Sequence, residues 1–333
     1  MEVWDRGQIR STAGIHNNKI IFVSGDGLLY CLDKASGKTI WTFKTGGEKL
    51  YPLYSFADYY QSSPQIKDGH VYFGSGDGNI YAVNEADGSL LWKYTTGDMV
   101  HATPALDGDK LFVGSFDGYV YALNNLTGVL LWKFKAVGHR YFPKGEMQGT
   151  PLVFNGSVFI GSRDYNLYAL NEKSGYGMWN RQFPRGWAMA PPVIKDSVMY
   201  VGTSDDFEMH AIDPQTGKSK WKTNVKFNIF GGSAFKGQNM YFGTLMGKLF
   251  ALDVKTGDVK WIFLTDAYKS NRFVYFKDDD TFRDDFVATV SKPNGMWLSL
   301  LKMGAIFSTP AIAQNSIVFT TMDGQVYCIS LPA

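Results

Sequence analysis

Short runs of alternating apolar and polar residues, each bounded by tight turns, follow one another along the chain. In residues 74–92, the segment 79–84 alternates in the manner of a half-buried strand. Asp-Gly pairs, which favour tight turns, lie before it at 77–78 and after it at 87–88. Residues 89–92 then begin another strand. The stretch therefore predicts strands joined by two tight turns.

The same central strand occurs seven times, and it reads apolar, ring-bearing, small, apolar, then a polar residue. The copies lie at residues 29–33, 80–84, 120–124, 167–171, 209–213, 249–253 and 326–330. A turn ending in Gly and then a Trp follow six of them, giving Trp41, Trp92, Trp132, Trp179, Trp221 and Trp261. Four-stranded units repeating every 40 residues or so, arranged radially, are the blades of a β-propeller.

The seventh copy has no Trp after it, whereas Trp4 stands near the start, before a segment like the opening strand of the other repeats. We therefore expect an all-β, seven-bladed propeller in a single domain, 1–333, closed by pairing of the N- and C-terminal strands. A start in mid-repeat is expected of a mature or excised form. Residues 262–307 lack the motif and are expected to be an insertion between the last two blades, with a short helix near 296–303. An eighth, degenerate blade within 262–307 is the alternative.

Composition excludes several classes of protein. With 33 basic and 31 acidic residues and no long basic run, the chain gives no indication of a nucleic-acid surface. No apolar run approaches the roughly 18 residues of a membrane helix, and from the first residues we expect no signal peptide in this chain. Two cysteines, Cys31 and Cys328, exclude a disulfide scaffold and a cysteine metal cluster. Whether these two pair with each other is left open.

Length varies mainly in the links between blades, at residues 42–62, 133–149, 180–190 and 262–307. In a four-stranded meander these links share a face with the turns between strands two and three, so we expect binding on this long-link face. The candidate ligand-binding residues lie in these links, turns and strand starts: Arg10, Gln61, His101, Gln148, Tyr59, Tyr60, His139, Arg140, Tyr141, Arg163, Asp164, Trp187 and Lys248. Aromatic platforms beside such polar groups suit a polar ligand. Turn formation, loop packing and bonds between blades are the alternative roles.

The pattern Gly-Asp-Gly-x-apolar-Tyr-Ala-apolar-Asp/Asn-x-x-Thr/Ser-Gly-x-x-x-Trp resembles the repeat of PQQ-like, quinoprotein-type propellers, which include BamB-like proteins. Thr127-Gly128 with Trp132 matches the Thr/Ser-Gly-x-x-x-Trp part of this pattern fully. The resemblance implies that Trp4 and the other six motif tryptophans each pack on the turn glycine of the next blade. A large ring buries much surface and a glycine allows close approach, so the motif concerns architecture. It also implies a periplasmic or extracellular location.

Dehydrogenases that share this repeat hold PQQ with adjacent cysteines, a stacking Trp and calcium ligands, and this chain has no adjacent cysteines. Common hydrolase, metalloprotease and nucleotide-binding motifs are also missing. We therefore expect no cofactor and no metal site. The favoured function is that of a non-catalytic, monomeric binding or scaffold propeller that holds a protein, peptide or saccharide on the long-link face and in the central funnel. The alternative is an enzyme with its site in the funnel, either a PQQ-dependent dehydrogenase or a carbohydrate-active hydrolase or lyase.

Overall fold

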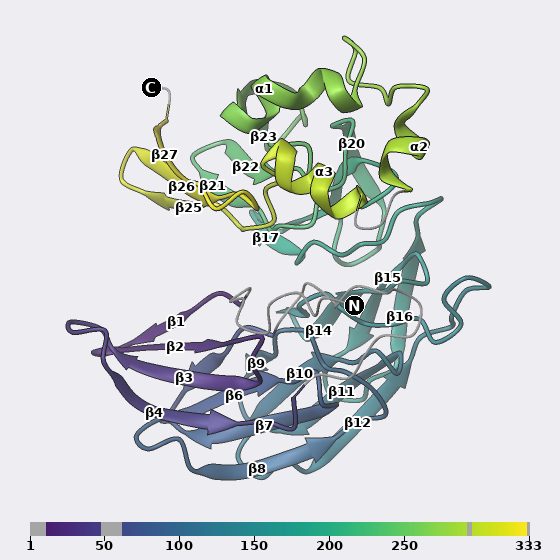
Figure 1. Ribbon diagram of the computed structural model, residues 1–333. Helices are drawn as coiled ribbons and strands as arrows, with labels where there is room; N and C mark the ends of the chain where they lie inside the picture. The colour runs from purple at the N-terminus through teal and green to yellow at the C-terminus, as the bar shows by residue number, and fades with distance from the viewer. Residues whose placement is uncertain (1–10, 48–61, 292–294, 332–333) are drawn as a thin grey trace. The chain divides into compact units, whose positions relative to one another are not determined.

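The computed structural model of the protein describes residues 11–47, 62–291 and 295–331 (Figure 1). The chain forms two compact units, Met1–Arg181 and Gln182–Ala333, which are described one at a time. The described strands form seven antiparallel sheets, six of them four-stranded and one three-stranded. The predicted seven-bladed β-propeller of antiparallel blades is confirmed.

The first unit contains four sheets, each a meander of consecutive strands. The first two sheets consist of β1 (Gly14–His16), β2 (Lys19–Val23), β3 (Leu28–Asp33), β4 (Thr39–Lys44), β5 (Gln65–Lys67), β6 (His70–Gly74), β7 (Asn79–Asn84) and β8 (Leu90–Thr95). The next two consist of β9 (Ala105–Asp107), β10 (Lys110–Gly114), β11 (Tyr119–Asn124), β12 (Leu130–Lys135), β13 (Leu152–Phe154), β14 (Ser157–Gly161), β15 (Asn166–Asn171) and β16 (Gly177–Gln182).

The second unit contains the other three sheets. Their strands are β17 (Val193–Lys195), β18 (Val198–Gly202), β19 (Glu208–Ile212), β20 (Ser219–Asn224), β21 (Ala234–Lys236), β22 (Asn239–Gly243), β23 (Lys248–Asp253), β24 (Val259–Leu264), β25 (Ala311–Ala313), β26 (Ser316–Thr320) and β27 (Val326–Ser330). The last sheet has three described strands, and the predicted fourth strand, with Trp4, lies outside the described residues.

Burial differs between the strands of one blade. The third strand is covered on both faces, so β11 has four consecutive buried residues, Val120 to Leu123. The fourth strand, at the outside, alternates: β12 buries Trp132 but exposes Leu131 and Lys133. A β-bulge lies in this pairing, because Ala122 pairs with Trp132 while Leu123 pairs with Leu130. Leu131 is therefore the extra residue of the bulge.

Neighbouring blades meet where a Trp lies against the next turn glycine. Trp92 Nε1 donates a hydrogen bond to the Asn125 carbonyl at 2.8 Å. Gly128 has a φ of +70°, and a Cβ on it would lie 2.8 Å from the Trp92 ring, so only glycine fits there. Equivalent bonds join Trp41 to Glu85, Trp132 to Glu172 and Trp221 to Val254, with lengths of 3.0, 2.9 and 3.0 Å.

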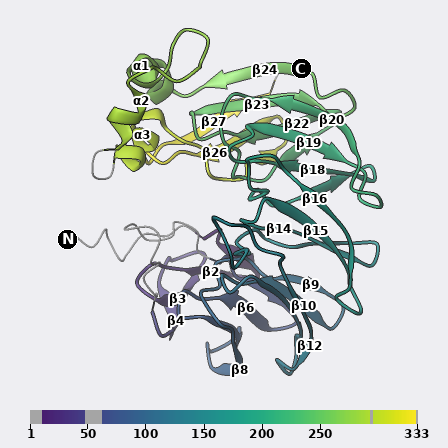
Figure 2. The ribbon, with the colours of Figure 1, turned by 90° about the vertical axis from the view of Figure 1, so that its right-hand side faces the viewer.

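Between β24 and β25 the chain forms helices α1 (Asp266–Tyr275), α2 (Phe286–Val290) and α3 (Gly295–Met303), which lie together at one side of the second unit (Figures 1 and 2). α3 confirms the short helix expected near 296–303. The eight-blade alternative is wrong, because the described part of 262–307 contains three helices and no additional sheet. Within the described ranges, no helix has both the length and the apolar character needed to cross a membrane.

Candidate functional site

The aspartate in the turn between the second and third strands ties adjacent blades together. Asp117 Oδ2 accepts hydrogen bonds from the Gly97 N–H at 2.7 Å and from the Tyr121 hydroxyl at 2.6 Å. Its Oδ1 accepts the N–H of Tyr119 within the turn. Burial and the bond to Asp117 raise the pKa of Tyr121, so this tyrosine stays a protonated donor. The turn aspartate is thus bonded to its own turn, its own blade and the preceding link.

Asp164, a predicted ligand-binding residue, occupies the same position in the fourth blade. It is 1% exposed, and its Oδ2 accepts the Tyr168 hydroxyl at 2.6 Å and the Gly138 N–H at 3.1 Å. These hydrogen bonds satisfy the buried Asp164 carboxylate within the fold, so its burial does not require a ligand. The sequence carries a signal for this arrangement that the prediction did not use, because Asp and Tyr recur four residues apart at 77 and 81, at 117 and 121, and at 164 and 168.

In the sixth blade the same two positions are Met246 and Phe250, both buried. Met246 packs in one apolar cluster with Tyr268, Met303 and other residues of the insertion. The Asp–Tyr pair of the first four blades is thus replaced by two apolar residues where the insertion covers the sixth blade.

Lys248, another predicted ligand-binding residue, anchors the insertion in the second unit. Its side chain is buried, and its Nζ lies 2.5 Å from Asp280 Oδ2. The other carboxylate oxygen of Asp280 accepts the Tyr268 hydroxyl, and the Lys248 ammonium lies 4.8 Å from the centre of the Tyr268 ring. Arg272 lies 3.6 Å from the same carboxylate. Lys248 therefore has partners within the fold.

In the turn between the second and third strands, one residue comes directly before the aspartate or before the residue that replaces it. This residue differs widely between blades. It is Gly25 and Gly76 in the first two blades, and a larger residue in the others: Phe116, Arg163, Asp205, Leu245 and Met322. None of these seven described residues has a positive φ, so the backbone does not require glycine there. Glycine at this position removes a side chain and leaves space.

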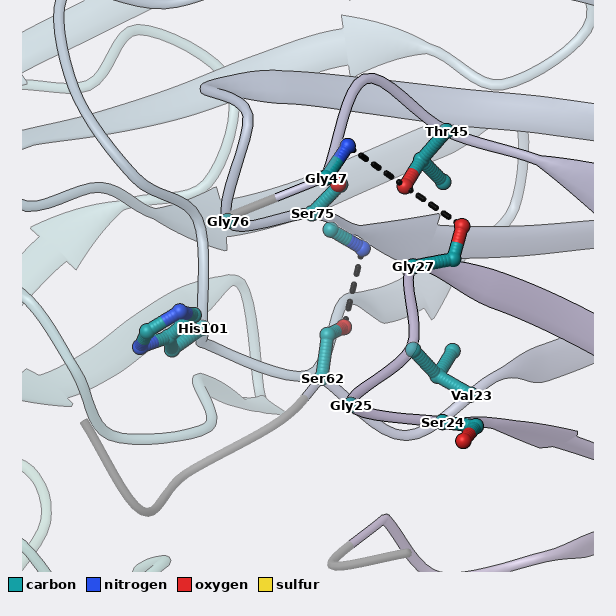
Figure 3. A pocket seen from close by; sticks show the side chains of 11 residues that line it. Val23, Ser24, Gly25, Gly27, Thr45, Gly47, Ser62, Ser75, Gly76 and His101 are labelled. Atoms are coloured by element: carbon teal, nitrogen blue, oxygen red, sulfur yellow. Dashed lines mark hydrogen bonds between the residues drawn. The ribbon is translucent and has the colours of Figure 1, made fainter. Parts of the chain in front are cut away.

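A small pocket lies at these two glycines (Figure 3). Its volume is about 30 Å³, which is room for water. Thr45 Oγ1 donates to the Gly27 carbonyl at 2.8 Å, and Ser62 Oγ accepts the Gly74 N–H at 2.8 Å. His101 stands at the wall of the pocket. The lining thus consists of hydroxyl groups and backbone, with the Val23 side chain and one imidazole.

His101 also belongs to a buried row of side chains in the first unit. Its ring lies 5.2 Å from that of Phe116 in an edge-on arrangement, and the Arg163 guanidinium lies 4.8 Å from the Phe116 centroid. Arg163 Nε and Nη2 donate to Gln148 Oε1 at 3.1 and 2.7 Å. All four side chains are more than nine-tenths buried. The structure therefore brings together three predicted residues, His101, Gln148 and Arg163, around Phe116, which the sequence reasoning missed.

Above this row, the link between the third and fourth blades presents a platform of rings and a cation. His139 and Phe142 exchange backbone hydrogen bonds, which places Arg140 and Tyr141 at the tip of a tight turn. The Arg140 guanidinium lies 4.7 Å from the centre of the Tyr141 ring, and Tyr141 is 60% exposed. The His139 ring lies 4.7 Å from Tyr165, nearly perpendicular to it. We call His139, Arg140, Tyr141 and Tyr165 the link platform.

Lysines secure the base of the link platform. Lys144 Nζ lies 2.6 Å from Asp98 Oδ2, and this bond raises the pKa of Lys144. Lys135 Nζ donates to the carbonyls of Asp117 and Lys144 at 2.5 and 2.7 Å. Burial lowers the pKa of Lys135, since the charged form loses solvation. These bonds fix the course of the link from the third to the fourth blade.

The remaining candidates lie elsewhere. Trp187 is half-buried in the second unit, where its backbone N–H donates to Ser204 Oγ at 2.8 Å. Four candidate ligand-binding residues lie outside the described residues: Arg10, Gln61, Tyr59 and Tyr60.

The donors that a quinone cofactor with calcium would use do not fit the described part of the chain. No cluster of three or more His, Cys, Asp or Glu side chains suited to a metal ion occurs within the described ranges. Both cysteines are free thiols, with Cys31 buried and Cys328 exposed. Neither forms the adjacent pair that the dehydrogenase resemblance requires.

A family model described as outer membrane protein assembly factor BamB matches residues 2–138 and 116–273. Among solved structures, BamB from Moraxella catarrhalis superimposes with a TM-score of 0.70 at 18% identity, covering 97% of this chain and 85% of that one. A computationally designed protein, Ika8, gives a TM-score of 0.58 at 14% identity, covering 98% and 97% of the two chains. At these identities the structures support the fold alone.

Curated relatives match over shorter stretches. Quinoprotein alcohol dehydrogenase PedH of Pseudomonas putida is 38% identical over 81 residues, 22% of this chain and 13% of that protein. The dehydrogenase subunit of the quinone-dependent alcohol dehydrogenase of Gluconobacter oxydans is 35% identical over 85 residues, 22% of this chain and 11% of that protein. The match thus spans less than one seventh of the length of these relatives.

Proposed function

Because the chain belongs to the family of outer membrane protein assembly factor BamB, we propose that it is a non-catalytic binding propeller. Its ligand is a protein or peptide segment held on the link platform of the first unit. The observation that carries this proposal is the exposed Tyr141 ring with the Arg140 guanidinium against it. Tyrosine and arginine are the residue types that contribute most often to hot spots of protein interfaces.

The row beneath the platform supports a positioning role. Arg163 and Tyr165 belong to one turn, and Arg163 is held by Gln148 while Tyr165 packs against His139. The buried row therefore stabilises the turn on which the platform rests. Rigid support lowers the entropy that a surface loses on binding, so an exposed platform on a fixed turn suits recognition.

The test compares proteins captured from a periplasmic extract by immobilised variants of the full chain. We expect Arg140→Ala with Tyr141→Ala to reduce capture of the specific partners about tenfold, a loss of about 1.4 kcal/mol. Val287→Ala is the control, because Val287 is 70% exposed on α2 and outside the platform. Equal capture by all three proteins, quantified by mass spectrometry, would refute the proposal.

The enzyme alternative has its own test. We propose that the protein uses no cofactor, in keeping with the misfit of the described side chains to PQQ and calcium. The protein is incubated with PQQ and calcium chloride, desalted, and examined by absorbance. A retained quinone chromophore together with dye-linked alcohol oxidation would establish a quinoprotein instead.

We also propose a periplasmic or extracellular location and a monomeric state. The location is supported by the description of the matching family model, an outer membrane assembly factor. Fractionation of the source cells, with detection by antibody, tests the location, and light scattering after gel filtration tests the mass. We propose that the motif tryptophans act only to couple blades, because their indole N–H groups donate to carbonyls of the next blade.

A further inference from the structure

The outer strand of a blade exposes the residue that immediately precedes its motif Trp. Where the pairing of the third and fourth strands contains a β-bulge, this residue is the extra residue of the bulge. Leu91 and Leu131 are examples. In the fifth and sixth blades the same position is a lysine, Lys220 or Lys260. In the first four it is apolar and 42–52% exposed: Ile40, Leu91, Leu131 and Met178.

The Thr-Gly turns add to this exposed apolar surface. The residue after the turn glycine is Val129 in the third blade and Tyr176 in the fourth, with exposures of 59% and 78%. Its counterparts in the second unit are the charged residues Lys218 and Asp258. Leu126 in the third-blade turn is also 59% exposed.

These side chains follow one another across three blades. Gly128 lies against the Trp92 ring, so the turn that carries Leu126 and Val129 adjoins the outer strand that carries Leu91. Gly175 lies against the Trp132 ring in the same way, which places Tyr176 beside the strand of Leu131. We call this set the outer apolar strip: Leu90, Leu91, Leu126, Val129, Leu131, Tyr176 and Met178.

Folding does not explain the strip. Lysine occupies the bulge position in two sister blades with the same pairing, so the backbone there accepts a charged side chain. Proteins commonly place lysine on edge strands to prevent unwanted pairing. At the bulge position, the first unit has an apolar residue instead of lysine in four successive blades. An exposed apolar surface that the fold does not need marks an interaction site.

Charge on the same strands indicates what the strip binds. β4, β8, β12 and β16 contain no Asp or Glu. On β12, Lys133 continues the exposed row that starts at Leu131, and on β8 Lys93 follows Leu91 in the same alternation. The outer strands β8 and β12 therefore present apolar side chains with lysine ammonium groups beside them.

We propose that the outer apolar strip docks a second partner, a segment whose apolar side chains are flanked by aspartate or glutamate. The apolar side chains cover the leucines and the carboxylates pair with the lysines of β8 and β12. This surface lies on outer strands and Thr-Gly turns, and none of its residues belongs to the link platform. The inference therefore stands independently of the function proposed for that platform.

The test uses a fluorescent peptide that alternates leucine and glutamate, with a leucine–lysine peptide as the charge control, and measures anisotropy with the full chain. The strip variant is Leu91→Lys with Leu131→Lys, which installs the residue of the fifth and sixth blades. The matched control is Val259→Lys with Ile262→Lys on β24, where both residues are also more than 40% exposed. We expect the acidic peptide to bind, and its Kd to rise about tenfold or more in the strip variant alone.

Thermal unfolding of each variant is measured to check that it remains folded at the assay temperature. The proposal is overturned if the acidic peptide does not bind at millimolar concentration, if the basic peptide binds equally well, or if the strip and control variants behave alike. It is also overturned if light scattering shows a dimer that Leu91→Lys with Leu131→Lys dissociates, because a second copy would then cover the strip.

Discussion

At the scale of single residues, the fold depends on a few polar groups that each make several bonds. The turn aspartate is the clearest case, since Asp117 accepts three hydrogen bonds from groups in its own blade and in the preceding link. The sixth blade dispenses with this arrangement by replacing both Asp and Tyr with apolar residues, Met246 and Phe250. A buried donor left without its acceptor is costly, whereas replacing both partners together is tolerated.

The first prediction follows from that contrast. Asp117→Ala should lower the free energy of unfolding by about 2–3 kcal/mol, because the Gly97 N–H and Tyr121 hydroxyl lose their acceptor. Tyr121→Phe alone should cost about 1 kcal/mol. The double variant should cost less than the sum, since the hydroxyl that Asp117→Ala leaves stranded is then absent. Urea unfolding of the four proteins measures the coupling, and strict additivity would contradict the shared bond.

The two cysteines should differ sharply in reactivity. Burial raises the pKa of the Cys31 thiol, which lowers its reactive thiolate fraction at neutral pH, and the side chain is also inaccessible. Cys328 is exposed. If the N-terminal strand does not cover β27, Cys328 should give one rapid maleimide adduct, whereas closure of the ring would slow this reaction. Cys31 should be modified only after denaturation in either case. Raising the pH should leave native Cys31 unmodified, because its side chain stays buried. Peptide mapping by mass spectrometry distinguishes the two sites.

At the scale of elements, blades are joined where a Trp packs on a turn glycine. Gly128→Ala should destabilise the protein by about 1–2 kcal/mol for the left-handed backbone and by about 1–3 kcal/mol more for overlap with Trp92. Gly108→Ala is the matched control, because Gly108 also has a positive φ but a Cβ on it would meet no atom within 4 Å. The difference between the urea midpoints of the two variants measures the contribution of packing between Gly128 and Trp92. Equal losses of stability in both variants would show that this packing contributes nothing.

The insertion depends on a buried ion pair. Asp280→Ala leaves the Lys248 ammonium without its carboxylate, and loss of one partner of a buried pair costs about 3–5 kcal/mol. Because this pair joins the insertion to β23, we expect faster hydrogen exchange in α1 and little change in the strands of the first unit. Exposed Asp284, which pairs with Lys277, provides the control variant Asp284→Ala. Unchanged exchange in α1 would show that the apolar cluster alone holds the insertion.

At the scale of the whole molecule, repetition made most of the fold predictable. Seven copies of one strand motif gave the number of blades, and alternation gave their strands. α1 was not predicted, because its sequence has no repeat to compare and its anchor, Lys248 with Asp280, joins residues far apart in the chain. That the candidate residues bind a ligand stays a prediction. His101, Gln148 and Arg163 do meet, but Phe116 between them looked like an ordinary turn residue.

The last prediction concerns the closure of the ring, which rests on the sequence since Trp4 lies outside the described residues. Six motif tryptophans follow a copy of the central strand, and Trp4 is the residue that would complete the seventh blade. If it does, Trp4→Ala should cost about 3–5 kcal/mol of unfolding free energy, as deletion of a buried large aromatic side chain does. Trp132→Ala sets the expected scale, because the Trp132 ring lies against Gly175 and its Nε1 binds the Glu172 carbonyl. A urea midpoint for Trp4→Ala equal to that of the parent protein, with a lowered one for Trp132→Ala, would mean that the N-terminal strand does not close the last blade.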